Sequence, residues 1–90
     1  MLLDIGGDVG ALVLVTPVEL HGREIEVSPL GLDGRRVHAA VLERRVGDRV
    51  VFAAVYPELR AGEHRIWDDV PGRDRRVTIV GGQVTWVDWG

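Results

Sequence analysis

Apolar residues fall in short runs along this chain, and the runs are rich in valine. No stretch keeps the i, i+3, i+4, i+7 apolar spacing of an amphipathic helix for long, and glycine, proline and aspartate separate one run from the next. The pattern therefore predicts an all-β protein, a seven-stranded antiparallel β-sandwich. We expect the strands at residues 9–15, 23–28, 36–46, 49–56, 63–67, 75–80 and 83–88.

The turn at Gly47-Asp48 predicts a hairpin that is apolar on both faces. A two-residue loop there places residue 42 opposite residue 53. One face is then assigned to the core, and the other carries Ala40, Leu42, Val51, Ala53 and Val55. A hairpin with one face in water should alternate apolar and polar residues, and this one does not. We therefore predict that a second copy of the chain or another protein covers the second face.

The turn at Gly81-Gly82 predicts a second hairpin, formed by residues 75–80 and 83–88. Pairing across a two-residue loop places Trp86 opposite Val77 on the core side, with Trp89 following on the outer side. Trp67 also points outward, because it shares a strand face with Glu63 and Arg65 and points away from Ile66. A sugar-stacking platform would have only these two outer tryptophans available.

Composition excludes several classes of protein. Ninety residues fit one domain, covering residues 1–90, and the lack of cysteine excludes disulfides, thiol nucleophiles and thiolate zinc sites. The net charge of -3 comes from 14 acidic and 11 basic residues scattered along the chain, so we expect no nucleic-acid partner. All the basic residues are arginine, which reflects either a GC-rich genome or anion recognition. The acidic N-terminal stretch indicates no signal peptide and no membrane span, and we expect a cytoplasmic protein.

A pattern in the second half of the chain resembles a known fold family. It reads Tyr56-x-x-Leu59-x-x-Gly62-x-His64-x-Ile66, followed by Val77-x-Ile79-x-Gly81-Gly82-x-Val84. This resembles the closing strands of the transthyretin-like (prealbumin-like) β-sandwiches, which include carboxypeptidase-regulatory-like and collagen-adhesin B-type domains. The resemblance implies that Tyr56, Leu59 and Ile66 are core residues, and that the sandwich is transthyretin-like or immunoglobulin-like. His64 stands where these families usually have tyrosine.

His64 has two interpretations. It is a metal ligand or base near Tyr56 and Glu63, or a core residue that replaces the inward tyrosine. No two histidines have the spacing of metal ligands, and the only serine, Ser28, lies in no nucleophile elbow. The C-terminus lacks the Tyr-Arg-Gly-Ser motif of the transthyretin-like hydrolases. We therefore expect no enzyme, no metal and no cofactor.

Two further clusters have a simple structural interpretation. Gly6, Gly7 and Gly10 precede a valine-rich strand, so they indicate a turn rather than a phosphate loop, which would open a helix. Asp68, Asp69 and Asp74 lack the spacing of a calcium loop, and three arginines lie in the same stretch, so they indicate a solvated loop with local charge pairs.

Together these observations predict a small non-enzymatic β-sandwich module that acts through protein association, with itself as the expected partner. The alternative is a small-ligand or metal-binding domain centred on His64, with Trp67 as a second ligand-facing residue.

Overall fold

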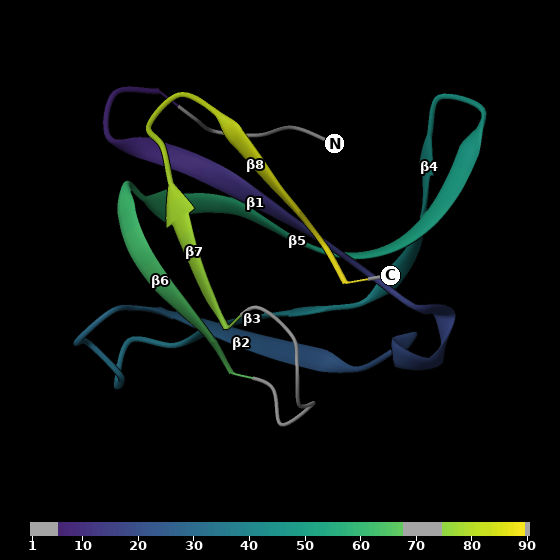
Figure 1. Ribbon diagram of the computed structural model, residues 1–90, viewed down its shortest axis with the longest axis horizontal. Helices are drawn as coiled ribbons and strands as arrows, with labels where there is room; N and C mark the ends of the chain where they lie inside the picture. Colours follow the sequence, from purple (N-terminus) through teal and green to yellow (C-terminus); the bar gives the residue numbers. More distant parts are fainter. Residues whose placement is uncertain (1–5, 68–74, 90) are drawn as a thin grey trace.

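The computed structural model describes residues 6–67 and 75–89, and nearly all regular structure in those ranges is β-strand (Figure 1). The strands are β1 (Val9–Thr16), β2 (Glu24–Pro29), β3 (Val37–Ala40), β4 (Leu42–Val46), β5 (Arg49–Arg60), β6 (Gly62–Trp67), β7 (Arg76–Ile79) and β8 (Val84–Asp88). One 3-10 turn, η1 (Val18–Leu20), follows β1. Sheet A has the order β4-β5-β1-β8, and sheet B has the order β3-β2-β6-β7. The all-β prediction is confirmed, with eight strands in the described ranges instead of seven. No helix in these ranges is long and apolar enough to cross a membrane.

The predicted strand 36–46 forms two strands that belong to different sheets. β4 pairs with β5, and Leu42 lies opposite Ala53 as the turn at Gly47 predicted. β3 instead pairs with β2, so Ala40 lies opposite Glu24 and is not part of the hairpin. Val41 lies between the two strands and is fully buried in the core. The chain therefore crosses from sheet B to sheet A at a buried apolar side chain.

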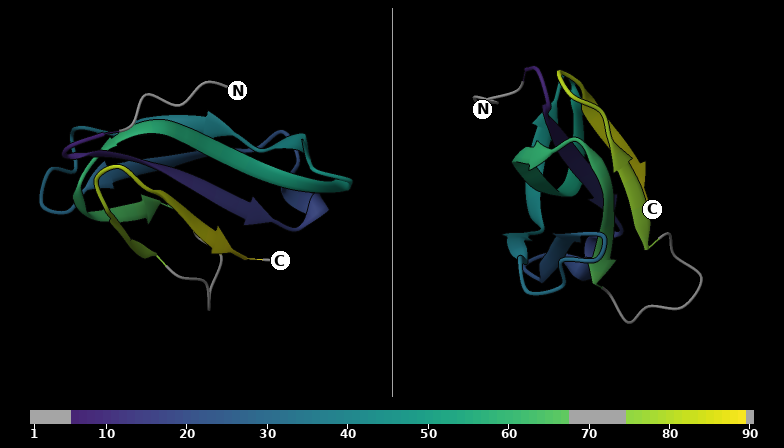
Figure 2. Two further views of the ribbon diagram at one scale, coloured as in Figure 1. Left: turned by 90° about the horizontal axis from the view of Figure 1, so that it is seen from above. Right: turned by 90° about the vertical axis from the view of Figure 1, so that its left-hand side faces the viewer.

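The predicted pairing across Gly81-Gly82 is wrong. The turn forms, with the Gln83 N–H donating to the Val80 carbonyl at 3.2 Å, but β7 pairs with β6 and β8 pairs with β1. The β1–β8 pair is parallel, which makes sheet A mixed, and Figure 2 shows β8 running beside β1 in the same direction. A Cβ atom on Gly81 would lie 1.9 Å from the Gly7 carbonyl oxygen. Only glycine fits this close approach, and two backbone hydrogen bonds hold the turn against the start of β1: Gly82 N–H donates to the Val9 carbonyl at 2.9 Å, and Ala11 N–H donates to the Gln83 carbonyl at 3.0 Å.

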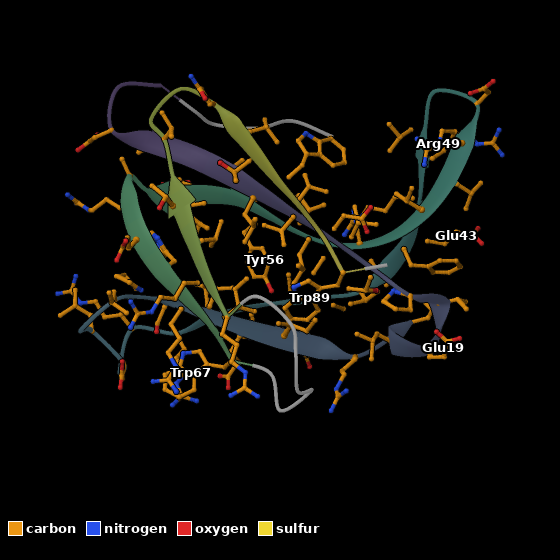
Figure 3. The ribbon with its side chains drawn as sticks, viewed as in Figure 1. Glu19, Glu43, Arg49, Tyr56, Trp67 and Trp89 are labelled. Carbon is orange, nitrogen blue, oxygen red and sulfur yellow. The ribbon has the colours of Figure 1, made fainter. Side chains whose placement is uncertain are left out.

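The core lies between the two sheets and contains side chains from both. Tyr56 of β5 links them, because its hydroxyl donates to the Ile25 carbonyl of β2 at 2.6 Å (Figure 3). Burial raises the pKa of Tyr56 above its ordinary value. Leu59 and Ile66 are also buried in this core, at the positions that the resemblance assigned to it.

Candidate functional site

The outer face of sheet A points away from sheet B, and we call it the association face. Register places on it every second residue of the four strands. These residues are Ala11, Val13, Val15, Leu42, Arg44, Val46, Arg49, Val51, Ala53, Val55, Val84, Trp86 and Asp88. All but Arg44, Arg49 and Asp88 are apolar, whereas the outer face of an antiparallel sheet is usually polar where it meets only water.

The centre of the association face consists of small side chains on β1 and β5. Val13, Ala53 and Val55 form a cluster separate from the main core, with Val15, Val51 and Val84 packed around it. Ala53 is 0% exposed and Val55 is 8% exposed, because neighbouring side chains on the same face cover them. The centre is therefore a low apolar floor rather than an open patch.

Two exposed apolar side chains rise on either side of this floor. Trp86 of β8 is 55% exposed, and Val46 of β4 is 44% exposed. A hollow of about 180 Å³ lies between them, with Val13, Ala53 and Val55 among its lining residues. A second hollow of about 200 Å³ adjoins it, because Val46 and Trp86 line both. The association face is thus a groove with one aromatic wall and one aliphatic wall.

Charged side chains also line the groove: Arg44 is among those of the first hollow, and Arg49 and Asp88 line the second. The Arg44 guanidinium lies at the edge strand β4, where its Nε–H donates to the Ala53 carbonyl at 3.0 Å. Arg49 begins β5 at the end of the β4–β5 hairpin (Figure 3), and Asp88 ends β8 on the opposite edge of the sheet. One margin is therefore basic and the other carries a carboxylate.

The sequence prediction located this face only in part. Leu42 is 45% exposed at its edge and Val51 lies half-buried within it, whereas Ala53 and Val55 are covered by the chain itself. Ala40 was assigned to this face wrongly, because β3 belongs to sheet B.

We predicted Trp86 on the core side, but the structure places it on the outer face of sheet A. β8 pairs with β1 in a register that sets Trp86 beside Val13, so the indole lies on the outer face. Trp89 was expected outside but packs against the core. Residues 84, 86 and 88 alternate with 85, 87 and 89, and both sets contain a valine and a tryptophan. The alternation of apolar residues in β8 therefore does not indicate which face of the strand points into the core. The strand with which β8 pairs determines that face.

His64 lies on the core side of β6 and is 2% exposed. Its Nδ1 is 3.1 Å from the Gly62 carbonyl oxygen, and its neighbours across the sheet are Pro29 and Val77. The adjacent Glu63 is exposed on the other side of the strand. A hollow of about 240 Å³ adjoins the ring, but residues 6–67 and 75–89 contain no group of three side chains that could hold a metal ion. The position matches that of an inward core residue.

The other predicted site residues lie away from the groove. Trp67 is half-buried on the outer face of sheet B, where its indole N–H donates to the Ser28 hydroxyl. Gly6 and Gly7 form a tight turn, closed by hydrogen bonds between Gly6 and Val9. The cluster of Asp68, Asp69 and Asp74 lies outside the described residues.

No protein-family model matches this chain, and no curated protein or solved structure is significantly similar to it.

Proposed function

We propose that this protein is a small non-enzymatic module that associates with a second copy of itself through the association face. The observation that carries the proposal is the exposed Trp86 beside an apolar hollow of about 180 Å³. A contiguous apolar surface of this kind marks interaction sites in soluble proteins. Association would remove the Trp86 indole and the lining of the hollow from water together.

A second copy suits the groove because the face carries basic residues on its β4–β5 side and a carboxylate at its β8 edge. A twofold axis lying in the interface, parallel to the strands, sets the β4 edge of one copy over the β8 edge of the other. Trp86 of each copy then packs on the apolar face of its partner, so that the contact forms twice. Tryptophan is among the residues that most often dominate the energy of an interface. The small side chain of Ala53 leaves room for close approach.

The charges at the margins suit the same arrangement. Arg44 and Arg49 lie on the β4–β5 side of the groove, and Asp88 lies at the β8 edge. The twofold axis brings the basic margin of each copy towards the acidic margin of the other. Complementary charges of this kind set the orientation of partners more than their affinity.

For the fold class we propose a β-sandwich of the transthyretin-like or immunoglobulin-like type. Its support is the burial of Tyr56, Leu59 and Ile66 at the positions that the resemblance assigns to the core. The alternative function, a ligand or metal domain centred on His64, has less support. The imidazole is almost fully buried, and its Nδ1 already lies within hydrogen-bond distance of a backbone carbonyl.

Sedimentation equilibrium of the wild type and of two matched variants tests the proposal. Trp86→Asp places a charge in the groove, and Val18→Asp places the same charge at a 54% exposed valine of η1, away from the groove. We expect the wild type and Val18→Asp to be dimers at micromolar concentration. Trp86→Asp should weaken the dimer by about 30-fold or more, since losing an interface hot spot costs about 2 kcal/mol. A wild type that stays monomeric at high micromolar concentration, with Trp86→Asp unchanged, contradicts the proposal.

A further inference from the structure

A row of arginines crosses the outer face of sheet B, on the opposite side of the molecule from the groove. Arg65 of β6 lies directly opposite Arg76 of β7, and on its other side it faces Ser28 of β2. Arg36 immediately precedes β3, where Val37 pairs with Val27, so Arg36 extends the row beyond Ser28. Like charges directly opposite each other on neighbouring strands repel. The placement of Arg65 and Arg76 therefore works against stability unless another group lies between them.

Trp67 stacks with two of these guanidinium groups, those of Arg36 and Arg65. Its indole N–H donates to the Ser28 hydroxyl at 2.9 Å, and the ring contacts the guanidinium groups of both Arg36 and Arg65. The Cζ atoms of Arg36 and Arg65 lie 3.6 Å and 4.0 Å from the ring centroid. A guanidinium that stacks on an aromatic ring uses its flat face and keeps the N–H groups at its edge for another partner. Stacking on Trp67 thus orients the Arg65 side chain before it donates hydrogen bonds to a ligand.

The described part of the chain does not neutralise three of the arginines. Arg36 pairs with Glu26 at 3.2 Å. Arg65, Arg75 and Arg76 have no carboxylate within ion-pair distance among residues 6–67 and 75–89. These three arginines line a hollow of about 280 Å³ together with Leu30. The hollow thus combines positive charge, unused N–H donors and one apolar side.

We propose that this hollow binds the oxyanion group of a ligand, a phosphate or a carboxylate, between Arg65, Arg75 and Arg76. A guanidinium presents parallel N–H donors that match two oxygens of such a group. The bound anion would also relieve the repulsion between Arg65 and Arg76. Because Arg65 is already stacked on Trp67, its side chain loses less conformational freedom on binding. This site does not depend on self-association, since it lies on the other sheet.

An NMR titration of the arginine side-chain Nε–Hε groups tests the site. Inorganic phosphate is added to the full chain, with sodium chloride adjusted to keep the ionic strength constant. We expect saturable shifts at Arg65 and Arg76, with little change at Arg45 and Arg49 on sheet A. A parallel titration with acetate separates the two ligand classes, because the natural group should saturate the site at the lower concentration. Shifts that stay linear for both anions, or that are equal at all arginines, overturn the proposal.

A matched pair of variants distinguishes anion binding at this site from nonspecific attraction to positive charge. Arg76→Gln and Arg45→Gln each remove one positive charge from an exposed strand arginine, the first inside the hollow and the second outside it. Arg76→Gln should weaken anion binding by about tenfold or more, as expected for the loss of a hydrogen bond to a charged group. Arg45→Gln should leave it unchanged, and an equal loss in both variants refutes the site. Arg75→Gln repeats the test if Arg76→Gln does not fold.

Discussion

Replacing Tyr56 with phenylalanine should lower the stability of the protein through a single lost hydrogen bond. Tyr56 is 3% exposed, and its hydroxyl joins sheet A to the Ile25 carbonyl of sheet B at 2.6 Å. Phenylalanine fills the same space but leaves that carbonyl without the donor. A buried group that loses its partner costs about 1 to 3 kcal/mol. For a domain of this size, each kcal/mol lowers Tm by roughly 4 to 8 °C.

The change in the free energy of unfolding at alkaline pH reports on the Tyr56 hydroxyl. Burial raises the pKa of Tyr56 above its ordinary value of 10.0, so the folded state keeps a proton that the unfolded state releases. The resulting stability is complete below that ordinary value and falls as the pH rises towards the folded pKa, by about 1.4 kcal/mol per pH unit. The chain has one tyrosine, no cysteine and no lysine. No other side chain therefore titrates between about pH 9 and pH 11, where arginine stays charged.

Urea unfolding at a series of pH values measures both effects. At neutral pH, Tyr56→Phe should have the lower free energy of unfolding. As the pH rises from about 9 to 11, the wild type should lose stability while the variant stays constant, so that the gap between them narrows. A variant as stable as the wild type at neutral pH would refute the role of the hydrogen bond. Equal slopes for the two proteins would refute the role of the tyrosine pKa.

Three other outcomes follow from the structure. Gly81→Ala should destabilise the fold by about 1 to 3 kcal/mol, as overpacking does, because its Cβ would meet the Gly7 carbonyl oxygen at 1.9 Å; Gly34→Ala, where a Cβ meets nothing within 4 Å, is the control in the same unfolding assay. Leu42→Asp should weaken self-association in light scattering without changing the circular dichroism spectrum, because Leu42 is 45% exposed at the edge of the groove; an unchanged molar mass would argue against that edge as part of the interface. Zinc should neither raise Tm nor shift the ring resonances of His64, because the described residues offer no group of three ligands; a saturable shift would restore the metal hypothesis.

Local sequence determined the positions of most strands and the register of one hairpin. Alternating apolar residues and turn-forming glycines act over a few residues, so the pairing of Leu42 with Ala53 across Gly47 follows from them alone. The resemblance to the transthyretin-like sandwiches implied that Tyr56, Leu59 and Ile66 are core residues, and all three are buried. The short-range pattern also indicated an apolar outer face on the β4–β5 hairpin, which became the groove.

Only the tertiary structure decided which sheet each strand joins. β3 pairs with β2 in sheet B and the chain crosses to sheet A at the buried Val41, while hydrogen bonds from the Gly81-Gly82 turn to Val9 and Ala11 place β8 beside β1. These contacts join residues far apart in the chain, and no local pattern records them. Because the partner of β8 sets which of its two apolar sides faces the core, Trp86 lies in the groove and Trp89 against the core. The candidate site thus depends on long-range packing, while its strands depend on local periodicity.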